Sequence, residues 1–142
     1  MSPAMNEPVP PEQASPPWMR WTGVALSVLT VLPLLASGGM KIAHSKQVLE
    51  GFAQFGYPES AILGIGLAEV VCALIYAFPA TAVLGAILVT GYLGGAVATH
   101  VRASQPFIAP LLLGVFAWAG LFLRDPRLRA LLPLRARAET VR

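Results

Sequence analysis

The sequence predicts an all-α integral membrane protein, an antiparallel bundle of four spanning helices with a short interfacial helix between spans one and two. Hydrophobic residues make up 56% of the 142 residues and charged residues only 12%, whereas soluble domains average roughly half apolar and a quarter charged. The apolar residues gather in long runs that end at prolines and charges, and runs of about 20 such residues cross a bilayer. We therefore expect a multi-pass protein whose main partner is the lipid bilayer.

The chain is expected to begin with a disordered tail over residues 1–19, where six prolines stand among polar residues and favour an extended chain over a helix. The membrane domain is expected over residues 20–133. Its first span is predicted at 21–40, because about 20 uncharged residues at a rise of 1.5 Å each give the roughly 30 Å of the hydrocarbon core.

A short interfacial helix is predicted between spans one and two. Apolar side chains recur there at roughly helical spacing among polar ones, and such a pattern is typical of a helix that lies in the membrane interface. These apolar residues are Ile42, Val48, Leu49, Phe52 and Phe55.

The next apolar run, residues 61–99, would extend about 58 Å as one helix, close to twice the thickness of the membrane. It must therefore fold back, and Phe78-Pro79 is the natural break, because the residue before proline resists helical geometry while proline suits the first turn of a helix. Spans two and three are predicted at 61–78 and 80–99, and a shorter fourth span at 107–123.

The orientation follows from the basic residues. Arginines concentrate after the last span, including a basic tail over residues 134–142, and the loops on the other side carry fewer basic residues. The positive-inside rule places both termini in the cytoplasm, and we expect the protein in the inner membrane. Juxtamembrane anchoring also accounts for the net charge of +3, so we expect no nucleic-acid partner.

Glu69 lies in the middle of the second predicted span, where a carboxylate must face the bundle interior and find hydrogen-bond partners or take up a proton. Counting residues from the Pro79 turn places it level with about Thr90, and counting from Met40 places Thr30 near the same plane. We predict an interior polar layer of Thr30, Glu69 and Thr90. This layer would either hold the helices in register or act as a proton or headgroup site.

Span three contains a GxxxG pattern at Gly91 and Gly95, and small residues at this spacing let helices approach closely. We predict that the pair serves helix packing within the bundle, with a homodimer seam as the alternative.

Basic residues should gather at the outer ends of spans one and three, namely Lys41, His44, His100 and Arg102. Such a mouth would attract an anionic ligand or lipid headgroup, or else the side chains simply extend to the interface. No metal site is predicted, because two histidines without matched carboxylates or cysteines fall short of a usual ligand set.

Several short motifs also follow one another in a fixed order, and together they resemble the DoxX-like family of small four-helix membrane proteins over residues 21–133. By position, the residues that match the family pattern are Lys41, Glu69 and His100. The motifs are Ser37-Gly38-Gly39-Met40-Lys41, Phe55-Gly56-Tyr57-Pro58, Gly66-Leu67-Ala68-Glu69, Phe78-Pro79-Ala80-Thr81, Thr99-His100 and Leu123-Arg124-Asp125-Pro126.

The family is named after a subunit associated with thiosulfate:quinone oxidoreductase, and other members are linked to oxidative-stress membrane complexes. The resemblance implies an accessory subunit or a lipophile-binding module of a membrane redox or stress-response system. We assign no catalytic residues and no resident cofactor, and we expect no stand-alone catalysis; the expected partners are a quinone or lipid ligand, other membrane or redox proteins, and a second copy of the chain. The alternatives are a quinone-linked oxidoreductase subunit and a small proton-coupled transporter.

Overall fold

A computed structural model describes residues 16–131, and every regular element in this part of the chain is helical. Two helices and the segment Pro79–Arg102 are long and apolar enough to cross a membrane, and Ile108–Arg124 is apolar but shorter. The all-α class is therefore confirmed. The elements are α1 (Pro17–Ile42), α2 (Lys46–Gln54), α3 (Ser60–Ala77), the 3-10 turn η1 (Pro79–Thr81), α4 (Ala82–Arg102), α5 (Ile108–Arg124) and α6 (Pro126–Leu131).

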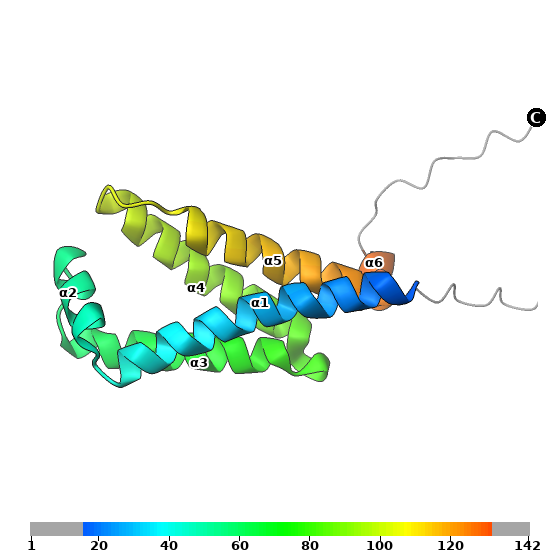
Figure 1. Cartoon of the computed structure of the whole chain (residues 1–142), viewed down its shortest axis with the longest axis horizontal. Coiled ribbons are helices and arrows are strands. Elements are labelled where there is room, and N and C mark those ends of the chain that lie inside the picture. The colour runs from blue at the N-terminus through cyan, green and yellow to red at the C-terminus, as the bar shows by residue number, and fades with distance from the viewer. Residues whose placement is uncertain (1–15, 132–142) are drawn as a thin grey trace, which may run out of the picture.

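The four long helices run side by side, and each runs opposite to the one before it (Figure 1). Helix α1 packs against α3 and α5, and α4 packs against the same two neighbours. The helices thus form a ring in the order α1, α3, α4, α5. Helix α2 lies at one end of this ring, and α6 lies at the other end beside the start of α1 (Figure 1).

Most of the predicted boundaries lie within a few residues of the helix ends, with two differences. Helix α1 begins at Pro17, inside the segment predicted as a tail, because proline suits the first turn of a helix. Helix α6 begins at Pro126 for the same reason and was not predicted from the sequence. Residues 1–15 of the predicted tail and the basic segment 134–142 lie outside the described residues.

Close approach between the helices depends on glycines other than the predicted pair. A Cβ atom on Gly23 would lie 2.7 Å from the Gly120 carbonyl oxygen in α5, and one on Gly66 would lie 2.7 Å from the Lys41 Cβ in α1. A Cβ atom on Gly85 would overlap backbone atoms of Tyr76 in α3. These contacts set the distances between α1 and α5, α1 and α3, and α3 and α4.

Gly91 and Gly95 do not pack helices together within the described chain, which corrects the prediction. A Cβ atom on either glycine would meet no atom within 4 Å among the described residues. The physical reason is their position on α4, where both face a cavity instead of a neighbouring helix. The alternative, a seam between two copies, stays a prediction.

Candidate functional site

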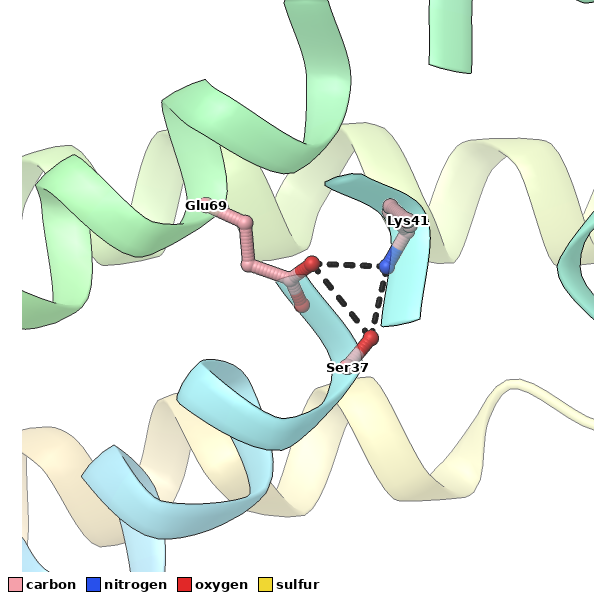
Figure 2. A network of polar contacts seen from close by, with 3 residues as sticks. All are labelled: Ser37, Lys41 and Glu69. Carbon is pink, nitrogen blue, oxygen red and sulfur yellow. Dashed lines mark hydrogen bonds and ion pairs between the residues drawn. The ribbon is translucent and has the colours of Figure 1, made fainter. Parts of the chain in front are cut away.

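Glu69 forms a mostly buried ion pair with Lys41. The Glu69 Oε2 atom lies 2.6 Å from the Lys41 ammonium nitrogen, and the two side chains are 4% and 13% exposed. Ser37 completes a triangle, because its hydroxyl accepts a hydrogen bond from Lys41 at 2.6 Å and donates one to Glu69 at 3.3 Å (Figure 2). The carboxylate in the middle of α3 is therefore neutralised by a cation from α1.

The local structure of α1 and α3 explains how Lys41 reaches Glu69. Ser37 and Lys41 are four residues apart and share one face of α1. Side chains on a helix lean toward its N-terminus, so Lys41 extends inward from the end of α1 rather than out to the interface. Gly66 leaves space for the lysine stem, which packs against it.

Tyr92 on α4 lies close enough to Glu69 for its hydroxyl to interact electrostatically with the carboxylate, and it lines the same cavity as Lys41. The sequence prediction missed this residue, although the count from the Pro79 turn came within two residues of it by placing Thr90 level with Glu69. A hydroxyl-bearing aromatic residue near that level was the available signal. The site thus joins residues of α1, α3 and α4.

Thr30 and Thr90 do not form the predicted layer with Glu69. The Thr30 hydroxyl is buried and donates to the Leu26 carbonyl oxygen, and the Thr90 hydroxyl donates to that of Ala86. A threonine hydroxyl has a single proton to donate, so neither residue donates to the carboxylate. Thr90 instead accepts a hydrogen bond from Trp118 of α5 at 2.8 Å.

A cavity of about 510 Å³ lies between α2 and α4, with Lys41 and Tyr92 in its wall. Most of the other lining side chains are apolar or aromatic, and glycines on α2 and α4 leave the space open. They include Val48, Gly51, Phe52, Phe55, Tyr57, Ile65, Gly91, Gly95 and Ala96.

The four residues predicted at the outer mouth do not form one cluster. Lys41 and His100 line the cavity, but Lys41 is paired with Glu69. Arg102 donates to the Phe55 carbonyl oxygen at 2.9 Å and lies 5.5 Å from the centre of the Tyr57 ring. His44 is exposed in the turn after α1, where its φ of 49° is left-handed, and it is not part of the cavity wall.

The segment after α2 is fastened to the end of α4 by several contacts. Tyr57 and Thr99 share a hydrogen bond of 2.9 Å, and the rings of Phe55 and His100 lie 5.1 Å apart. Together with the Arg102 contacts, they hold the aromatic side of the cavity in place.

Comparison with known proteins identifies a family. A family model described as the DoxX-like family matches residues 25–120, a stretch that contains Ser37, Lys41, Glu69 and Tyr92. Neither a search of curated proteins nor one of solved structures found a match.

Proposed function

The chain belongs to the DoxX-like family, and on that premise we propose that it is a lipophile-binding membrane module that holds a small ligand in the cavity between α2 and α4. The observation that carries the proposal is a cavity of about 510 Å³ with a buried ion pair at its wall. Ligand sites typically enclose about 300–1,000 Å³ and combine apolar walls with a few placed polar groups. The aromatic wall would hold an apolar body, and Lys41 would orient a polar head.

We propose further that all four long helices cross the inner membrane and that both termini lie in the cytoplasm. The chain reverses direction at each connection (Figure 1), and α5 is uniformly apolar from Ile108 to Leu123. Arg20, Arg124, Arg127 and Arg129 all lie near the end of the bundle where α1 begins and α5 ends, as the positive-inside rule requires for the cytoplasmic side.

A reporter experiment tests this topology. Green fluorescent protein fused before Met1 or after Arg142 is expected to fluoresce in both cases, since it folds in the cytoplasm, and alkaline phosphatase at the same positions is expected to be inactive. Alkaline phosphatase inserted at Ser104, between α4 and α5, should be active. Opposite results at the two termini would mean that only three helices cross the membrane.

A quinone-linked role is the second candidate function. It is favoured by the pairing of a lysine, which can donate to a quinone carbonyl oxygen, with a neighbouring carboxylate that can exchange a proton. In this role the protein would act as a subunit of a larger redox complex.

Filling the cavity should abolish binding. Gly95→Leu places a side chain where no neighbouring atom of residues 16–131 lies within 4 Å of the new Cβ, so we expect the fold to persist while the affinity for a decyl-substituted benzoquinone falls at least about tenfold. Native mass spectrometry of the detergent-solubilised protein would measure the bound fraction.

The matched control for this experiment is Gly64→Leu. Gly64 is also a helical glycine with open space around it, but it is exposed on α3 and does not line the cavity. This variant is expected to bind like the wild type. Equal binding by the wild type, Gly95→Leu and Gly64→Leu would contradict the proposed site.

A further inference from the structure

The charges around the cavity cancel one another. Lys41 is the one residue of the wall with a permanent charge, and its ammonium group is paired with Glu69 at 2.6 Å. The His100 ring is held against the Ala96 carbonyl oxygen, and the Arg102 guanidinium lies over Tyr57 outside the wall. The expected basic mouth for an anion is therefore absent from the described residues.

A second carboxylate or phosphate in the cavity would have to share the Lys41 ammonium with Glu69. Like charges this close repel strongly where little water screens them. For an anionic ligand, the free-energy cost of leaving water would thus exceed the free energy gained from its interaction with the lysine. A neutral ligand meets no such penalty.

The cavity wall nevertheless retains one hydrogen-bond donor at Lys41. An ammonium group has three N–H donors, and Lys41 uses two of them, for Glu69 and for Ser37. The third remains available for an oxygen atom of a ligand. The Tyr92 hydroxyl in the same wall lies near the Glu69 carboxylate.

The other end of the cavity presents an acceptor. The His100 Nδ1 atom lies 2.7 Å from the Ala96 carbonyl oxygen. Because a carbonyl only accepts, Nδ1 carries a proton, and in that tautomer Nε2 is an acceptor. Tyr92 and His100 are eight residues apart on α4 and both line the cavity, so the wall extends about 12 Å along the helix axis between them.

We propose that the cavity selects an uncharged lipophile, with a carbonyl or similar acceptor oxygen at the end that meets Lys41, and excludes fatty carboxylates and other anions. This inference rests on the proposed function, since it names the ligand class of the same cavity. Glu69 is the specificity-determining residue, because its carboxylate cancels the lysine charge.

The test compares two ligands with the same undecyl chain, methyl undecyl ketone and dodecanoate, at pH 8, where the carboxylate is ionised. We expect the wild-type protein in nanodiscs to bind the ketone at least about tenfold more tightly than dodecanoate. Glu69→Gln leaves Lys41 without a carboxylate partner, and we expect it to reverse the preference in favour of dodecanoate. Apparent dissociation constants from titration calorimetry give both ratios.

Each outcome has a distinct meaning. If the wild type prefers dodecanoate and Gly95→Leu blocks that binding, the ligand class is wrong but the cavity site stands. If Gly95→Leu weakens the binding of neither ligand, the proposed function itself is wrong. The wild-type comparison uses no substitution in the ion pair, so it decides the ligand class even if Glu69→Gln fails to fold.

Discussion

Replacing Lys41 by methionine is expected to lower the free energy of unfolding by about 3–5 kcal/mol, because it leaves Glu69 buried without its cation. The Glu69 side chain is 4% exposed, so solvent offers it little compensation. The remaining hydrogen-bond partner, Ser37, supplies a hydroxyl but no opposite charge. Reversible unfolding in mixed micelles with increasing dodecyl sulfate, followed by circular dichroism, would measure the change.

The double variant Lys41→Met with Glu69→Leu is the decisive comparison. Replacing both members of a buried pair by apolar residues is often neutral or even stabilising, so we expect the double variant to recover most of the loss. Glu59→Leu is a suitable control, since Glu59 is exposed and has no ion-pair partner among the described residues. Losses that simply add in the double variant would show that the two charges do not depend on each other.

The second large effect is expected at Gly85. Gly85→Ala places a Cβ atom onto backbone atoms of Tyr76, and a helix backbone cannot move aside as a flexible side chain can. Helices α3 and α4 would have to separate, at an expected loss of about 3 kcal/mol in the free energy of unfolding. The same micelle titration would detect it.

The effect at Gly85 should also reach other helices through Tyr76. The Tyr76 hydroxyl is fully buried, donates to the Ala117 carbonyl oxygen in α5 at 2.7 Å and lies 3.0 Å from the Ser27 hydroxyl in α1. Displacing α3 would therefore disturb its contacts with both helices, and the near-ultraviolet circular dichroism of the tyrosines should change.

Gly94→Ala is the control on the same helix, since a Cβ atom there meets no atom within 4 Å among the described residues. It is expected to change the free energy of unfolding by no more than about 0.5 kcal/mol. Equal losses in Gly85→Ala and Gly94→Ala would show that general glycine effects, and not the contact with Tyr76, determine the stability.

The helices themselves were predictable because their signals are local. Hydropathy, proline and charge placed α1, α3, α4 and α5 within a few residues of their ends, and a carboxylate in an apolar run marked Glu69. These features depend on the chain within one helix or one turn, so a single sequence contains them.

The partners of Glu69 were harder to predict from the sequence because they depend on the register between helices. The tight Pro79 turn fixes the register of α3 and α4, so counting from it came within two residues of Tyr92. No such turn joins α1 to α3, and taking Met40 as the outer end selected Thr30 instead of Ser37 and Lys41. Lysine at a span end is also usually read as reaching outward, whereas Lys41 reaches inward.

The glycine pattern shows a related limit. Spacing identifies residues on one face of a helix, but it does not say which neighbour that face meets. Gly91 and Gly95 fit the familiar pattern and face a cavity, whereas Gly85 fits none of the patterns considered and makes the closest approach to another helix.

The ion pair also constrains the order of membrane insertion. Lys41 precedes Glu69 by 28 residues, so during synthesis α1 enters the bilayer before its partner exists. Lys41 lies one residue from the end of α1, and its ammonium group can stay among the lipid headgroups until α3 is inserted. Glu69 lies in the middle of α3, so its carboxylate cannot reach the lipid headgroups. Glu69 must therefore enter the bilayer either protonated or in contact with α1. In the second case, insertion of α3 depends on α1 being in place first.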